Sequence, residues 1–237
     1  GKTSFTMNIA TNVAKQTGKK VAVFSLEMSA EQLASRMLSS EAMVDSYALR
    51  SGKLEDEDWQ KLAHAVQNLS GCEIYIDDST GLTITQMKSK LRRMKNLGLI
   101  VVDYLQLMQS DRRNDNRTAE VGDISRNLKI MGKELGVPVI CCAQLSRNPE
   151  SRTGSAGKRP MISDLRESGS IEQDADVIIF LYRDDYYATD KPDEAEANIC
   201  EVIVAKNRHG ATGTVELGWT PQFTTFYNLE SHHEEGE

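Results

Sequence analysis

The chain has 237 residues, of which 39% are hydrophobic and 27% are charged, a composition typical of a globular protein with one larger α/β domain or two small ones. No apolar run approaches the roughly 20 residues that a membrane-spanning helix needs, so we expect no membrane association of that kind. The formal net charge of −7 excludes indiscriminate binding to nucleic acid, and any nucleic-acid site must therefore be local.

The chain begins with Gly1-Lys2-Thr3, the last three positions of the phosphate-binding motif G-x-x-x-x-G-K-[ST]. In this motif backbone N–H groups and the Lys bind phosphates, and the hydroxyl ligates Mg²⁺. A helical pattern follows at once, with Gly18 as its C-cap, and the first N–H groups of such a helix can bind an anion. We therefore expect Gly1, Lys2, Thr3 and Ser4 to bind a nucleotide. The alternative is a Gly-Lys turn ahead of an ordinary helix.

The upstream half of this motif and the strand that precedes such a loop are missing from the sequence. We therefore expect that the chain is truncated at its N-terminus, within the phosphate-binding loop. Four cysteines lack the C-x-x-C spacing of redox and zinc motifs, and two of them lie in an apolar run, as reduced and buried cysteines do. This pattern favours a cytoplasmic protein.

Short apolar runs alternate with helical patterns, which is typical of a mostly parallel sheet covered by helices. Two capping boxes, Ser29-x-x-Gln32 and Thr83-x-x-Gln86, mark helix starts between the runs. After residue 182 the pattern changes to two runs joined by a short polar turn, which predicts an antiparallel hairpin. The predicted strands are Val21–Ser25, Ile74–Asp77, Leu99–Asp103, Val137–Ala143 and Val177–Tyr182, then Ile199–Lys206 and Gly213–Trp219 in the hairpin, and a further one at Phe223–Tyr227.

Polar residues follow three of the predicted parallel strands, at the sheet edge where α/β proteins bind ligands. Asp103 ends an apolar strand in the Walker B pattern, in which an Asp holds Mg²⁺ or its water shell. Glu27 can orient or deprotonate a water, and Gln144 can sense a γ-phosphate through hydrogen bonds. The alternatives are a turn-initiating Asp103 and a Glu27 that merely favours a helix N-terminus. The joint position of the three side chains favours a nucleotide hydrolysis site.

The segment Gln144–Arg166 is a local basic region in an acidic chain. It lies mostly in a predicted loop, Ser146–Ser163, which is longer than most connections in compact domains. A basic loop near the nucleotide edge suits a phosphate backbone, and because the loop has no aromatic residue we expect no stacking on bases. A solvated loop is the alternative. The candidate DNA contacts in this segment are Arg147, Lys158 and Arg166.

Several motifs resemble those of the bacterial DnaB-type replicative helicases. They are Phe24-Ser-Leu-Glu-Met28, Val102-Asp-Tyr-Leu-Gln-Leu-Met108, Lys206-Asn-Arg-His-Gly210 and, most specifically, Ser163-Asp-Leu-Arg-Glu-Ser-Gly-Ser-Ile-Glu-Gln-Asp-Ala-Asp176. The motifs occur in consistent order from residue 1 to about 227. The resemblance implies an α/β fold with a RecA-like P-loop NTPase core, ATP and Mg²⁺ as cofactors, and ATP-driven 5′→3′ translocation on single-stranded DNA as a homohexameric ring that unwinds duplex DNA.

The resemblance also implies roles for individual residues. Lys2 and Thr3 would bind phosphate and Mg²⁺, Glu27 would be the catalytic base, and Asp103 would be the Walker B acid. Gln144 would link the γ-phosphate to the DNA loops. The two residues that would act in trans on the neighbouring subunit's nucleotide are Lys206 and Arg208. The residues on the DNA-facing loop would be Arg166, Glu167 and Gly169.

The resemblance further implies a domain organisation. Residues 1–229 would be the ATPase and helicase motor domain, and residues 230–237 an acidic tail. A primase and a helicase loader would contact the protein through an N-terminal region that precedes this chain, at the replication fork in the nucleoid. Two alternatives remain: a recombinase or clock-type ATPase with the same fold, and a nucleotide-dependent switch that barely hydrolyses ATP. The 163–176 motif disfavours the first and Glu27 disfavours the second.

Overall fold

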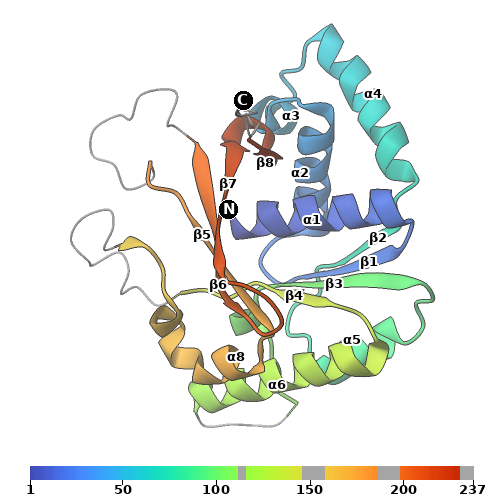
Figure 1. Cartoon of the computed structure of the whole chain (residues 1–237). Helices are drawn as coiled ribbons and strands as arrows, with labels where there is room; N and C mark the ends of the chain where they lie inside the picture. The colour runs from blue at the N-terminus through green and yellow to red at the C-terminus, as the bar shows by residue number, and fades with distance from the viewer. Residues whose placement is uncertain (112–115, 146–157, 186–197, 230–237) are drawn as a thin grey trace, which may run out of the picture.

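Four parallel strands form the central sheet of the protein, in the order β2-β1-β3-β4 (Figure 1). The computed structural model describes residues 1–111, 116–145, 158–185 and 198–229. The four strands are β1 (Lys20–Ser25), β2 (Ile74–Asp77), β3 (Leu97–Asp103) and β4 (Val139–Cys141). The sequence prediction of these four strands is confirmed, although β4 is shorter than the predicted range 137–143.

Helices cover both faces of this sheet, and the side chains of β1 are accordingly buried on both faces. Successive strand residues point to opposite faces, and in β1 Val21 and Val23 face one helical layer whereas Ala22 and Phe24 face the other. All four side chains are almost fully buried. The first layer contains α1 (Lys2–Thr17) and α2 (Ala30–Ala42), and the second contains α5 (Ile84–Leu91) and α6 (Arg117–Leu135) (Figure 1).

The capping boxes predicted from the sequence are present at two helix starts. The side chain of Ser29 accepts a hydrogen bond from the backbone of Gln32, and Thr83 does the same for Gln86. Gly18 ends α1 in the left-handed conformation with φ 63°, which glycine adopts at little cost. The remaining helical elements are α3 (Ser46–Ser51), α4 (Asp56–Ser70), η1 (Leu105–Leu107), η3 (Ile162–Ser168), α8 (Gly169–Asp174) and η4 (Pro221–Phe223).

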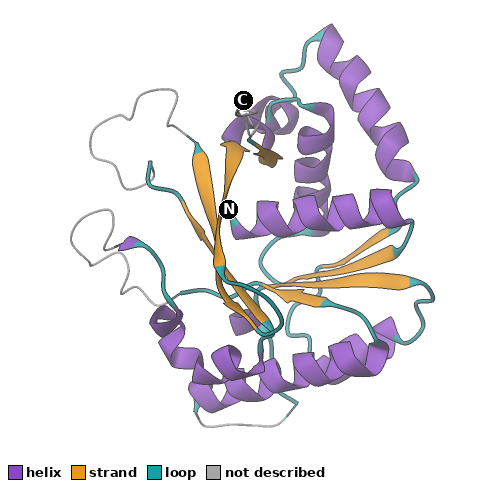
Figure 2. Cartoon of the chain, viewed as in Figure 1, coloured by secondary structure: helices purple, strands orange, loops and turns teal. Residues whose placement is uncertain are grey.

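A second sheet is antiparallel and has the strand order β5-β6-β7-β8. The strands of both sheets are orange in Figure 2. The predicted hairpin is confirmed, but the strand at Val177–Tyr182 does not join the parallel sheet as its place in the alternating pattern suggested. It pairs antiparallel with β6, Phe180 opposite Ile203. The apolar pattern of a strand specifies its buried face and not its partner, so the sequence could not distinguish the two sheets. The strands are β5 (Val177–Tyr182), β6 (Ile199–Asn207), β7 (Gly213–Thr220) and β8 (Thr225–Asn228).

The last strand, β8, lies against α1 and thereby connects the antiparallel sheet to the helical layer on the parallel sheet. Asn8 of α1 accepts a hydrogen bond from the backbone N–H of Phe226, with a nitrogen–oxygen distance of 2.8 Å. The Phe226 ring contacts Trp219 at 4.5 Å and Phe5 edge-on at 5.4 Å between ring centroids. Phe223, predicted as the start of this strand, instead ends η4, because Thr224 turns the chain with φ 51°.

Several sequence predictions fall on residues outside the described ranges. These are most of the predicted loop at 146–163 and the acidic tail at 230–237. Within the described residues no helix is both long and apolar enough to span a bilayer. All four cysteines are free thiols, and the burial of Cys142 raises its pKa to about 12.

Candidate functional site

The register of the parallel sheet places Asp103 and the segment that carries Glu27 at one edge of the sheet. Ser25, at the end of β1, lies opposite Asp103, at the end of β3, and the backbone N–H of Leu26 donates to the Asp103 carbonyl at 2.7 Å. Glu27 follows two residues after β1. Because β1 and β3 are adjacent and parallel, the segments that follow them start from the same edge.

Thr3 and Asp103 are in direct contact at this edge. The Thr3 hydroxyl donates to Oδ2 of Asp103 at 2.6 Å, across a separation of 100 residues. Asp103 is only 2% exposed, and its other carboxylate oxygen, Oδ1, has no hydrogen-bond partner among the described residues. A buried carboxylate oxygen without a partner is costly unless another group satisfies it.

This pair fits a magnesium ion. Mg²⁺ prefers oxygen ligands and is typically held by one or two protein groups, with water and substrate phosphates completing its shell. A hydroxyl beside a buried carboxylate with one free oxygen provides that donor set. Among the described residues there is no cluster of three or more His, Cys, Asp or Glu side chains that could hold a metal ion.

The first turn of α1 is open to an anion. Gly1 is its N-cap and provides no side-chain hydrogen bond, and the turn contains no acidic residue. The first N–H groups of a helix have no partner within the helix, and they carry a partial positive charge. Lys2 is exposed beside them, whereas Ser4 is buried. The N-terminus of α1 therefore has the properties expected of a phosphate site next to the Thr3–Asp103 pair.

A short turn holds Glu27 outside the adjoining helix. The buried Ser25 hydroxyl donates to the carbonyl of Met28 at 2.7 Å, and the Met28 N–H donates back to it at 3.3 Å. Ser29 is the N-cap of α2, so Glu27 precedes the helix and does not lie in its first turn. Its side chain is exposed, as a base that activates a water molecule requires.

Gln144 lies beyond β4 and is held through its backbone. The side-chain amide of Gln106 donates to the Gln144 carbonyl at 3.1 Å and accepts from the Gln144 N–H at 3.1 Å. This two-point contact fixes the chain and leaves the Gln144 side chain exposed. The residue is thereby anchored to the segment that follows Asp103, two residues before the region 146–157, which lies outside the described ranges.

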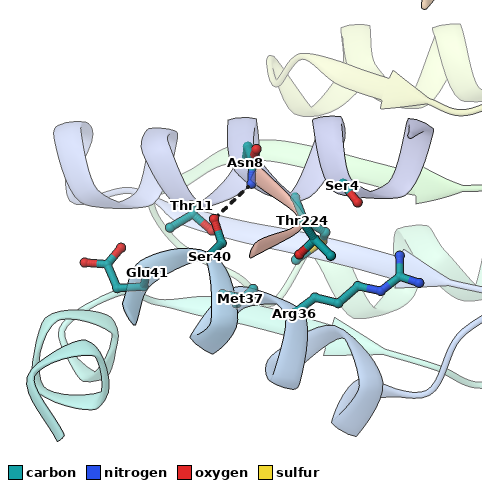
Figure 3. A pocket seen from close by; sticks show the side chains of 9 residues that line it. Ser4, Asn8, Thr11, Arg36, Met37, Ser40, Glu41 and Thr224 are labelled. Atoms are coloured by element: carbon teal, nitrogen blue, oxygen red, sulfur yellow. Dashed lines mark hydrogen bonds between the residues drawn. The ribbon is translucent and has the colours of Figure 1, made fainter. Parts of the chain in front are cut away.

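Arg36 is a candidate that sequence reasoning missed. Its side chain extends between α1 and α2 toward the end of α1 that bears Ser4 (Figure 3). It is half-buried and makes no hydrogen bond or ion pair with any described residue. Burial and, secondarily, the charge of Arg50 lower its pKa, while the carboxylates of Asp103 and Glu27 oppose that shift. No motif marks this arginine, because its position depends on how α2 packs on α1.

Lys206 and Arg208 lie at the far end of β6, where they contact their own chain. The Lys206 ammonium donates to the carbonyls of Glu172 and, at 2.8 Å, Ala175. The Arg208 guanidinium donates to the Gln173 carbonyl at 2.7 Å. Both cations therefore contact α8, and Lys206 also contacts Ala175, the residue just after it. Among the described residues, none of their hydrogen bonds or ion pairs is with the Thr3–Asp103 pair of the same chain.

The predicted DNA-facing residues do not all lie on one element. Arg147 lies outside the described residues, and Lys158 is half-buried. Arg166 and Glu167 belong to η3, and Gly169 begins α8. The segment is anchored by Asp164, which is 2% exposed and accepts a hydrogen bond from the Met161 N–H at 2.8 Å.

The comparisons with known proteins agree over nearly the whole chain. Residues 1–228 match the family described as DnaB-like helicase C terminal domain. The replicative DNA helicase DnaB of Geobacillus stearothermophilus is 52% identical over 241 residues, which cover 100% of this chain and 52% of the relative. The chain spans about half the length of the curated relatives it matches.

Two solved structures share the fold closely. One is an ATPase domain that is 41% identical and superimposes with a TM-score of 0.89, covering 97% of this chain and 81% of that one. The other is a DnaB-like replicative helicase, solved in a study of its interactions with primase. It has the same identity and TM-score and covers 97% of this chain and 55% of that one.

Proposed function

Because this chain belongs to the DnaB-like helicase C-terminal domain family, we propose that it is the ATP-driven motor of a replicative DNA helicase. The observation that carries the proposal is the bond between the Thr3 hydroxyl and Asp103, whose second carboxylate oxygen is buried without a partner among the described residues. It links the phosphate-binding helix to the Walker B strand and provides ligands that suit Mg²⁺. Residues 1–229 are proposed as the motor domain and 230–237 as its acidic tail.

In the proposed site each residue has a separate task. The first N–H groups of α1 and the side chain of Lys2 hold the phosphates, while Thr3 and Asp103 hold Mg²⁺ or its water shell. A bound Mg²⁺ would neutralise charge on the phosphates. Glu27 orients and deprotonates the attacking water, and its position outside α2 leaves it accessible to that water. Arg36, half-buried beside the same edge, adds positive potential toward the phosphate end of α1.

The DNA site is proposed on the segment between Gln144 and Gly169. Gln144 would connect the nucleotide edge to this segment, which carries Arg147, Lys158 and Arg166. Glu167 and Gly169 complete the proposed DNA-facing set. We propose single-stranded DNA as the ligand, contacted through its phosphates, and a homohexamer as the working assembly, in which Lys206 and Arg208 act on the neighbour's nucleotide. A primase and a loader are proposed partners, and the cytoplasm at the replication fork is the proposed location.

Unwinding of forked DNA tests the proposal. The purified full-length protein should separate a duplex with a 5′ single-stranded tail when ATP and Mg²⁺ are present. A duplex with only a 3′ tail should not be separated, because we propose 5′→3′ translocation. Strand separation is measured by fluorescence of a released labelled strand. ATP hydrolysis without separation of either substrate would favour a recombinase. ATP binding with barely any hydrolysis would favour a switch.

Neutralising Arg166 together with Lys158 should weaken binding to single-stranded DNA and flatten its salt dependence. Each lost phosphate contact lowers the slope of log affinity against log salt by about 0.7 for single strands. The loss should be nearly equal on different sequences, because phosphate contacts do not read bases. Fluorescence anisotropy at several salt concentrations measures both effects. The control is Arg126→Ala, which removes an exposed cation from α6; a slope unchanged in the double variant would contradict the assignment.

A further inference from the structure

The C-terminal end of α8 has no cation of its own. Its last turn contains no basic residue, and Asp174 places a carboxylate there. The final carbonyls of a helix lack intrahelical partners and attract positive charge. Here the partners come from another element: Lys206 binds the carbonyls of Glu172 and Ala175, and Arg208 binds that of Gln173. Both proposed trans-acting cations therefore cap this helix within their own subunit.

Asp176, just beyond α8, reinforces this arrangement. Its carboxylate lies 3.6 Å from the Arg208 guanidinium and also forms an ion pair with Lys129 of α6. The hydrogen bond from Lys129, with the charges of Lys129, Arg208 and His209, holds the pKa of Asp176 below its usual range, so it stays anionic. The Arg208 N–H also donates to the Asp176 carbonyl at 2.8 Å. That backbone bond keeps the turn in place when the Arg208 side chain moves.

The side-chain contacts are exchangeable. The Arg208 and Asp176 side chains are 45% and 46% exposed, so solvent screens their ion pair and water can replace it. A nucleotide phosphate carries more negative charge than a carboxylate and accepts bidentate hydrogen bonds from a guanidinium. It would therefore compete successfully for these cations whenever it lies within their reach.

The helix that holds the cations continues directly from the proposed DNA segment. η3 carries Arg166 and Glu167 and ends where α8 begins at Gly169. The join is packed tightly against α6: a Cβ added to Gly122 would lie 2.6 Å from the Ser170 hydroxyl. Because η3 and α8 are contiguous, a displacement of η3 would also move the start of α8.

We propose that Asp176 is a positioning residue that, together with the C-terminal carbonyls of α8, docks Lys206 and Arg208 in competition with the neighbouring subunit's nucleotide. The inference rests on the proposed function. Phosphate in the next subunit draws the two cations away and loosens the end of α8. DNA bound at η3 shifts the same helix and releases the cations toward that nucleotide. The docking site thereby couples DNA binding to hydrolysis.

Hydrogen exchange tests the docking without reference to activity. In the nucleotide-free full-length protein, Lys206→Ala combined with Arg208→Ala should raise exchange of the amides in 169–176 by about tenfold, because charge-assisted bonds to the helix end are lost. Asp176→Asn should raise it about two- to fivefold, the range of an exposed ion pair. The control is Asp123→Asn on α6, whose carboxylate makes no hydrogen bond or ion pair with a described residue. Unchanged exchange in the double variant would overturn the docking.

Nucleotide binding should change hydrogen exchange in the same direction as the double variant does. A non-hydrolysable ATP analogue with Mg²⁺ should raise exchange in 169–176 of the wild-type hexamer, and should add nothing in the Lys206→Ala, Arg208→Ala protein. Binding of the analogue is followed separately with a fluorescent derivative. A wild-type protein that binds the analogue and keeps full protection of α8 would overturn the competition. A wild-type protein that binds no nucleotide would contradict the proposed function, while the nucleotide-free measurement still decides the docking.

Steady-state kinetics distinguish positioning from a merely structural role. Asp176→Asn should raise ATP turnover without DNA and reduce the stimulation by single-stranded DNA about two- to fivefold, because the cations are already partly released. A variant that is only destabilised would lose turnover under both conditions and keep its stimulation ratio. That second pattern would overturn the proposal, as would a stimulation ratio equal to that of wild type.

Discussion

Replacing Glu27 with glutamine should reduce ATP turnover of the full-length protein by about 10²- to 10⁴-fold, the typical contribution of a positioned general base. Nucleotide affinity should change little, because Glu27 is exposed at the end of a turn and acts on water in the transition state. Glutamine keeps the size and shape of the side chain but removes its negative charge and its basicity. Turnover is measured by phosphate release and affinity with a fluorescent ATP analogue.

Lys2→Ala should give the opposite pattern, a loss of nucleotide affinity itself. Lys2 precedes the Thr3–Asp103 pair on the first turn of α1, where it can contact the phosphates in the ground state as well as in the transition state.

The matched control for Glu27 is Glu31→Gln, which removes an exposed carboxylate from the first turn of α2 and should leave turnover unchanged. Near-normal turnover in Glu27→Gln would contradict its assignment as the base.

Arg208→Ala should lower turnover by about 10³- to 10⁵-fold if its guanidinium acts as a finger on the neighbouring subunit's nucleotide. Arg208 follows β6 directly and its side chain is 45% exposed, so solvent exposure leaves it accessible to a second subunit. Mixing inactive Arg208→Ala subunits with inactive Glu27→Gln subunits should restore part of the activity. In mixed rings some interfaces combine an intact Glu27 with an intact Arg208 from the neighbour.

The mixing experiment needs two controls. Mass spectrometry must show that mixed rings form, and Arg208→Lys should remain defective, since an ammonium lacks the planar donor fork of a guanidinium. Mixed rings without recovered turnover would argue against action in trans. Full activity of Arg208→Ala alone would show that Arg208 is not a finger.

The sequence by itself was enough to predict the order of elements and the polar ends of the parallel strands. Both signals are local: apolar periodicity marks a strand, a capping box marks a helix start, and Asp103 and Glu27 follow their strands directly. Because parallel strands end at one edge, the sequence predicted that these carboxylates lie at the same edge of the sheet. The Gly1-Lys2-Thr3 motif likewise indicated the helix that approaches them.

Only the tertiary structure decided which distant groups touch. The bond from Thr3 to Asp103, the antiparallel partner of β5 and the approach of Arg36 to the phosphate end of α1 depend on packing between segments far apart in the chain. The docking of Arg208 on α8 is of the same kind, because a helix end attracts any cation and sequence spacing does not say which. The local sequence pattern specifies which secondary-structure element each segment forms. Burial against neighbouring segments specifies which residues it contacts.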